Sequence, residues 1–118
     1  MKLIIMFLLL ISPLFSNKLS DMYLVKACKK DIALGCYNLG KKYLKSKSLR
    51  QGKLKALTMF DKSCRLNYSK ACLKLGEIYE KGKVANRNIR KALFYYKKAC
   101  TQNNYTSCIK YNNLKNKK

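Results

Sequence analysis

The stretch KSCRLNYSKACLKLGEIYEKG at residues 62–82 decides the fold, because the spacing of its two cysteines recurs on either side. Cysteines eight residues apart occur three times, and successive pairs are 36 residues apart: Cys28 and Cys36, Cys64 and Cys72, Cys100 and Cys108. A fixed period of about 20–50 residues is typical of solenoids, in which each repeat stacks on its neighbours. We therefore predict about three copies of one structural unit.

Other residues keep the same 36-residue period, which strengthens this interpretation. The recurring positions are Leu39-Gly40 with Leu75-Gly76, Tyr43 with Tyr79, and Ala56-Leu57 with Ala92-Leu93. A lysine also precedes the first cysteine of every pair by two residues.

The cysteine spacing constrains the backbone of each repeat. Residues eight apart on one α-helix lie about 12 Å apart along the axis, whereas a disulfide needs Cα atoms within about 4.4–6.8 Å. Each pair must therefore straddle a turn between two antiparallel helices. Six cysteines allow many pairings, and the repeat favours the one that joins 28 with 36, 64 with 72 and 100 with 108.

Each repeat is thus expected to be a helix-turn-helix hairpin in an all-α chain. We predict first helices over residues 20–29, 53–65 and 89–100, and second helices over 32–45, 69–81 and 105–114. Gly40 and Gly76 fall inside second helices, where glycine is unfavourable, so we expect close helix packing there. Gly82 is a candidate helix C-cap, and Ser46 is a weaker one at the equivalent position.

Composition bounds the size and the chemistry of the chain. It has 118 residues, 27 Lys and Arg against 5 Asp and Glu, a formal charge of +22 and no His. This length is typical of one small domain. The absence of His excludes Ser-His-Asp triads and His-ligated zinc. Two interpretations of the charge stay open: a solvated face, or binding to anionic surfaces.

The N-terminus has the pattern of a secretory signal peptide. Lys2 precedes an unbroken apolar run from Leu3 to Ile11, which Pro13 ends. We predict cleavage after Ser16 and a mature repeat domain over residues 17–118, with an N-terminal anchor helix as the alternative. Export favours disulfides and a secreted or periplasmic location.

The repeat pattern resembles Sel-one-like repeats, which are relatives of tetratricopeptide repeats. The matching motifs are Lys98-Ala99-Cys100, residues 72–82 and Lys91-Ala92-Leu93. The 36-residue period with paired cysteines is similar to the Helicobacter cysteine-rich proteins. The resemblance implies a right-handed α-solenoid with disulfide-stapled repeats at about residues 20–52, 53–88 and 89–118.

The resemblance also implies a function, since that family carries a β-lactamase label. It implies β-lactam (penicillin) binding and slow β-lactam hydrolysis. The wider solenoid relatives are mainly protein–protein adaptors, so the alternative is a non-catalytic interaction scaffold. A third hypothesis is binding of anionic envelope polymers through the lysines. We expect no nucleic-acid partner and no stable membrane anchor.

The third repeat departs from the pattern. Asn112 and Lys115 stand where Gly76 and Tyr79 stand one repeat earlier. This repeat is either a terminal cap, which solenoids need, or a shortened copy.

The residues themselves point to no catalytic constellation. One Ser-x-x-Lys motif runs from Ser107 to Lys110, but matches of this kind are expected by chance in so lysine-rich a chain. Ser107 also aligns with Ala71, the small residue beside the preceding disulfide. We assign no catalytic residue and expect no metal or cofactor, and we place Glu77 and Glu80 on a solvated face.

Overall fold

The computed structural model describes residues 19–46 and 49–117, and this part of the chain is all-α. A helix over residues 19–29 is followed by five labelled helices: α2 (Ala33–Leu44), α3 (Leu49–Arg65), α4 (Ser69–Lys81), α5 (Ile89–Thr101) and α6 (Tyr105–Lys115). The predicted all-α solenoid is confirmed. The proposed signal peptide, residues 1–16, lies outside the described residues and stays a prediction.

The boundary of α3 is the main difference from the predicted helices. This helix begins at Leu49, four residues before the predicted start at Lys53. Its first turns include Gly52, which is buried, and a Cβ built there would lie 2.6 Å from the Tyr43 carbonyl oxygen. The glycine thus allows the beginning of α3 to pass close to the end of α2.

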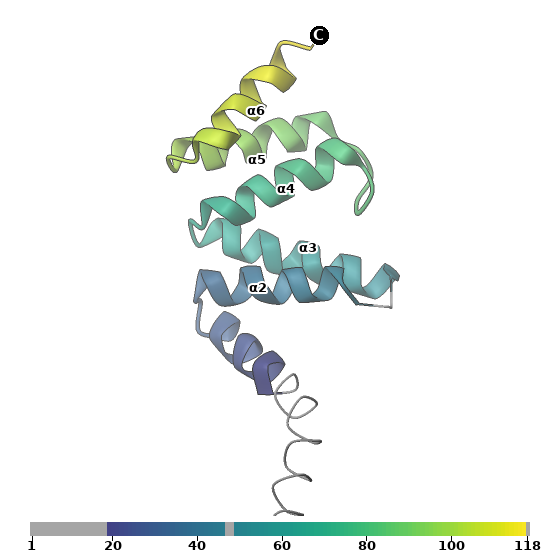
Figure 1. Cartoon of the computed structure of the whole chain (residues 1–118), viewed down its shortest axis with the longest axis vertical. Coiled ribbons are helices and arrows are strands. Elements are labelled where there is room, and N and C mark those ends of the chain that lie inside the picture. The colour runs from purple at the N-terminus through teal and green to yellow at the C-terminus, as the bar shows by residue number, and fades with distance from the viewer. Residues whose placement is uncertain (1–18, 47–48, 118) are drawn as a thin grey trace, which may run out of the picture.

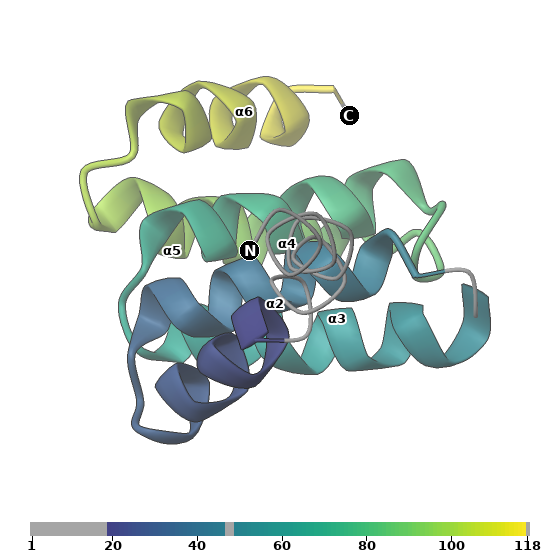
Figure 2. The same cartoon turned by 60° about the horizontal axis from the view of Figure 1, so that its bottom comes forward.

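The helices stack in chain order, as Figure 1 shows from purple to yellow. The extensive contacts among labelled helices join consecutive ones: α2 with α3, α3 with α4, α4 with α5, and α5 with α6. Figure 2, turned by 60°, shows α6 at one end of this stack. Each hairpin is therefore stabilised by its neighbours rather than by one central core.

Three disulfides staple the hairpins at their turns. They join Cys28 to Cys36, Cys64 to Cys72 and Cys100 to Cys108, with Cα–Cα distances of 4.5, 4.8 and 4.7 Å. Between the two cysteines of each pair, the residues Asp31, Asn67 and Asn103 have positive φ angles of 61°, 67° and 67°. Asp and Asn tolerate this left-handed conformation better than most residues. The polar residues between the cysteines therefore make the tight turn that brings the sulfur atoms together.

Glycines inside the second helices receive aromatic rings from the next repeat. Phe60 of α3 packs against Gly40, and Tyr96 of α5 packs against Gly76 at the equivalent position. A Cβ built on Gly76 would lie 2.4 Å from Tyr96 Cδ1, and one on Gly40 would lie 2.8 Å from Phe60 Cε1. The close packing predicted at both glycines is therefore present.

The core is small and consists of alanine, cysteine and single large side chains. Its central cluster includes Phe60, Leu75 and the Cys64–Cys72 disulfide. Gly82 ends α4 in the left-handed region with φ of 75°, as its sequence position predicts. The chain then turns back across α4 before α5 begins, and this loop forms one wall of the candidate site.

Candidate functional site

All five acidic side chains are engaged within the chain. Four form ion pairs: Asp21 with Lys42, Asp31 with Lys62, Asp61 with Arg65, and Glu77 with Lys81. The fifth, Glu80, accepts a hydrogen bond of 2.6 Å from the Tyr96 hydroxyl. The remaining lysines and arginines of the described part therefore have no side-chain carboxylate to balance them. This leaves a surface that attracts external anions.

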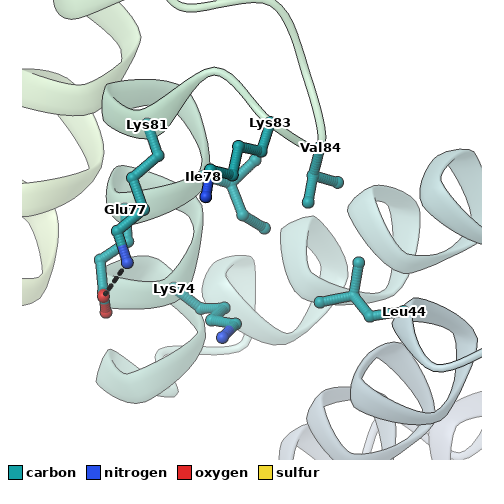
Figure 3. Close-up of a pocket in the computed structure, with 7 residues that line it drawn as sticks. All are labelled: Leu44, Lys74, Glu77, Ile78, Lys81, Lys83 and Val84. Atoms are coloured by element: carbon teal, nitrogen blue, oxygen red, sulfur yellow. Dashed lines mark ion pairs between the residues drawn. The ribbon is translucent and has the colours of Figure 1, made fainter.

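One hollow combines this charge with an apolar floor. It has a volume of about 150 Å³ and is lined by Leu44, Lys74, Glu77, Ile78, Lys81, Lys83 and Val84. Figure 3 shows the aliphatic side chains of Leu44, Ile78 and Val84 around the hollow, with the lysines at its edge. We call these seven residues the lysine-rimmed pocket.

Three segments of the chain position the pocket. Leu44 is the last residue of α2, and Ile78 lies in the last turn of α4. Lys83 and Val84 follow the Gly82 cap, so the left-handed glycine directs them back over the helix. The Lys53 ammonium donates a hydrogen bond of 3.2 Å to the Lys83 carbonyl and ties this loop to α3.

Two of the rim lysines are available to a ligand. Lys81 pairs with Glu77 at 3.8 Å, as the dashed line in Figure 3 marks. Lys74 and Lys83 have no ion pair or side-chain hydrogen bond among the described residues. An anionic group with a short apolar part would meet both ammonium groups while its apolar part covers the floor.

A related hollow occurs one repeat earlier. It has a volume of about 300 Å³ and is lined by Ser20, Leu24, Asn38, Lys41, Lys42 and Lys45. Four of these residues lie 36 positions before pocket residues, namely Asn38 before Lys74, Lys41 before Glu77, Lys42 before Ile78 and Lys45 before Lys81. The stack therefore presents one lysine-bearing hollow on α2 and another on α4, which share four aligned positions and one aligned lysine, Lys45 with Lys81.

The Ser-x-x-Lys motif has a structural role. Ser107 is fully buried, and its hydroxyl donates a hydrogen bond of 3.0 Å to Asn104 Oδ1. The same oxygen accepts the Ser107 backbone N–H and caps α6. No hydrogen bond joins this hydroxyl to Lys110. Ser107 therefore lacks the exposure and the adjacent base that a nucleophile needs.

The prediction that Glu77 and Glu80 lie on a solvated face is wrong. Both are half-buried: Tyr96 of α5 packs beside Glu80 and donates a hydrogen bond to it, and Glu77 lies in the pocket lining, paired with Lys81. Burial and the hydrogen bond to Glu80 raise the pKa of Tyr96. Burial and the nearby Asp61 carboxylate raise the pKa of Tyr95 to about 12. These tyrosines stay protonated and act as hydrogen-bond donors to carboxylates.

The sequence pattern does not predict Leu44, Lys83 and Val84 as pocket residues. Leu44 and Val84 have no recurring counterpart in the period, since Glu80 and Ser48 stand at the equivalent positions. Lysine is a residue type expected in an anion-binding site, but lysines are spread over the whole chain, so their positions alone do not indicate the pocket.

Residues 19–46 and 49–117 carry neither a metal-binding cluster nor a membrane-spanning helix. No group of three or more Cys, Asp or Glu side chains there is arranged to hold a metal ion. No helix in that part is long and apolar enough to cross a bilayer.

The comparisons with known proteins agree with the repeat architecture. The Sel1 repeat family model matches residues 33–68 and 69–104. These units take the second helix of one hairpin with the first helix of the next, a different phase from the predicted repeats. Among solved structures, Helicobacter pylori cysteine rich protein B matches with 33% identity and a TM-score of 0.68 over 79% of this chain and 69% of that chain. No curated protein matches the chain significantly.

Proposed function

The chain belongs to the Sel1 repeat family, and we propose that it is an exported, non-catalytic scaffold that binds an acidic segment of another protein. Three disulfides in a chain of this size are typical of oxidising compartments outside the cytoplasm. The presence of two lysine-bearing hollows along the stack, one on α2 and one on α4, carries the proposal. Sites one repeat apart suit an extended polypeptide better than a single small molecule.

The charge balance supports an acidic partner. Lys74 and Lys83 have no ion pair among the described residues, and Glu77, the acidic residue in the pocket lining, is paired with Lys81. The floor formed by Leu44, Ile78 and Val84 adds apolar contact and so favours acidic residues that flank an aliphatic one.

Hydrolysis of β-lactams, which the resemblance implies, stays a prediction without a candidate nucleophile. Ser107 is buried and holds the start of α6. A β-lactam is itself a carboxylate, so the lysine-rimmed pocket offers it a place to bind with no nucleophile to open the ring. Turnover of a chromogenic cephalosporin by the oxidised protein, faster than by free lysine at the same amine concentration, would favour the enzyme.

The test of the scaffold is peptide binding with a charge-matched control. A fluorescent peptide of alternating glutamate and leucine is titrated with the oxidised protein, and its anisotropy is followed at low and at moderate salt. The variant K74Q/K83Q removes both available rim ammonium groups. The variant K97Q/K117Q removes the same charge from exposed positions outside the pocket.

We expect K74Q/K83Q to weaken binding at least tenfold and K97Q/K117Q to weaken it less than threefold. A peptide with glutamine in place of glutamate should not bind. Equal losses in both variants, with equal binding of an acidic polysaccharide, would overturn the proposal in favour of an unspecific anionic surface.

A further inference from the structure

A third hollow lies between the helix over residues 19–29, α2 and α3. It has a volume of about 180 Å³ and is lined by Val25, Cys28, Lys29, Leu39, Tyr43, Met59 and Lys62. None of these residues belongs to the lysine-rimmed pocket. Its walls are mostly apolar, and Tyr43 presents an aromatic ring to it.

The next repeat shows what fills the equivalent place. The residues 36 positions later are Asp61, Cys64, Arg65, Leu75, Tyr79, Tyr95 and Lys98. There the Tyr95 ring stacks on the Tyr79 ring with a centroid distance of 5.8 Å and an interplanar angle of 7°. The Tyr95 hydroxyl donates a hydrogen bond of 3.3 Å to Asp61.

The first repeat lacks the ring that the second repeat supplies. Met59 stands where Tyr95 stands, so Tyr43 has no stacked partner from α3, and a hollow lies beside it. Both repeats place a lysine over the equivalent tyrosine ring. Lys55 lies over the Tyr43 ring at 5.6 Å, as Lys91 lies over the Tyr79 ring at 5.0 Å. In the second repeat Tyr79 accommodates both the lysine and the stacked ring.

The lining identifies the kind of ring that fits. A cavity of about 150 Å³ lined by apolar side chains is large enough for benzene. Val25 replaces Asp61 and offers no acceptor for a hydroxyl, so a phenyl ring suits the hollow better than a phenol. Lys29 replaces Arg65, which is held by Asp61, and Lys29 has no ion pair among the described residues. A carboxylate next to the ring would pair with it.

Another hollow adjoins the hollow beside Tyr43. It has a volume of about 330 Å³ and shares Val25, Leu39 and Tyr43 with it. The ring would therefore enter from a longer channel, which suits a side chain carried by a polypeptide.

We propose that this hollow binds the phenylalanine side chain of a partner segment, with an adjacent carboxylate paired to Lys29. The inference rests on the proposed scaffold function in taking the partner to be a polypeptide. The bound ring would stack on Tyr43 as Tyr95 stacks on Tyr79.

The test uses N-acetyl-phenylalanine as the probe and N-acetyl-alanine as its control, with amide shifts of the oxidised protein as the readout. We expect saturable shifts around Leu39 and Tyr43 with the phenylalanine probe alone. The variant M59Y restores the ring of the second repeat and should weaken binding at least tenfold. M59L keeps an aliphatic side chain and should bind within threefold of the original protein.

A second variant keeps the test decisive if M59Y folds poorly. K29Q changes an exposed residue and should weaken binding of the carboxylate probe severalfold, but not binding of N-acetyl-phenylalanine amide. Equal responses to the alanine control, or unchanged binding in both M59Y and K29Q, would overturn the inference. Binding of the glutamate–leucine peptide does not depend on this hollow, so the scaffold proposal can fail or stand separately.

Discussion

Gly76→Ala tests the packing that joins the second repeat to α5. The added Cβ would lie 2.4 Å from Tyr96 Cδ1 and 2.5 Å from Cε1, well inside contact distance. The ring cannot turn aside freely, because Tyr96 is fully buried and its hydroxyl is bound to Glu80 at 2.6 Å. Overpacking of this kind costs about 1–3 kcal/mol, whereas alanine gains about 1 kcal/mol over glycine in a helix interior.

We expect the clash to dominate and the free energy of unfolding to fall by up to about 2 kcal/mol. In a domain of this size that loss lowers Tm by up to roughly 15 °C. Thermal unfolding of the oxidised protein, followed by far-ultraviolet circular dichroism, measures the shift.

The control is the same substitution in a Tyr96→Leu background. Leucine removes the ring edge that meets the new Cβ, so Gly76→Ala should there be neutral or stabilising by up to about 1 kcal/mol. Gly40→Ala should cost less than Gly76→Ala, because its nearest contact is the longer 2.8 Å to Phe60. A rise in Tm on Gly76→Ala alone would refute the close-packing account.

Three further predictions concern the disulfides, Tyr95 and the Ser-x-x-Lys motif. Each disulfide closes a short loop and so contributes about 2.5 kcal/mol to the free energy of unfolding. Full reduction should therefore unfold the protein or leave it molten, which circular dichroism measures. The Cys100–Cys108 disulfide should be reduced and alkylated first, because both its cysteines are half-buried while the other four are buried; an unchanged melting curve or the reverse order would contradict this. Asp61→Asn should lower the pKa of Tyr95 from about 12 in an absorbance titration. Because that pKa lies above the ordinary value of about 10, the stability from Tyr95 is present below pH 10 and is lost as pH rises through 12; no change in the variant would exclude Asp61 as a cause. Ser107→Ala should leave β-lactam turnover unchanged and alter the free energy of unfolding by less than about 1 kcal/mol, since the backbone cap to Asn104 remains.

Much of the fold could be predicted because it follows from a strict period. The cysteine pairs set the hairpins, and Gly40 and Gly76 indicated where the hairpins pack closely. The start of α3 at Leu49 was missed, since Gly52 within its first turns is adapted to a tertiary contact with Tyr43 rather than to helix propensity.

The candidate sites were harder to predict because they lie where the repeats differ. The lysine-rimmed pocket needs Val84, which has Ser48 at the equivalent position. The hollow beside Tyr43 lies where Met59 stands in place of the second repeat's Tyr95. A sequence period shows which residues the repeats share. These hollows depend instead on single residues that differ between repeats, and on side chains from three segments that meet only in the folded chain.

Binding of an acidic segment is the central claim, and an amide-shift titration tests it most directly. The oxidised, isotope-labelled protein is titrated with the glutamate–leucine peptide, and the shifts are mapped onto the helices. We expect saturable shifts concentrated around Lys74, Ile78 and Val84, with a second group around Lys41 on α2 and Lys45 directly after it. Shifts scattered over lysines of every helix, or no saturable shifts at moderate salt, would contradict it.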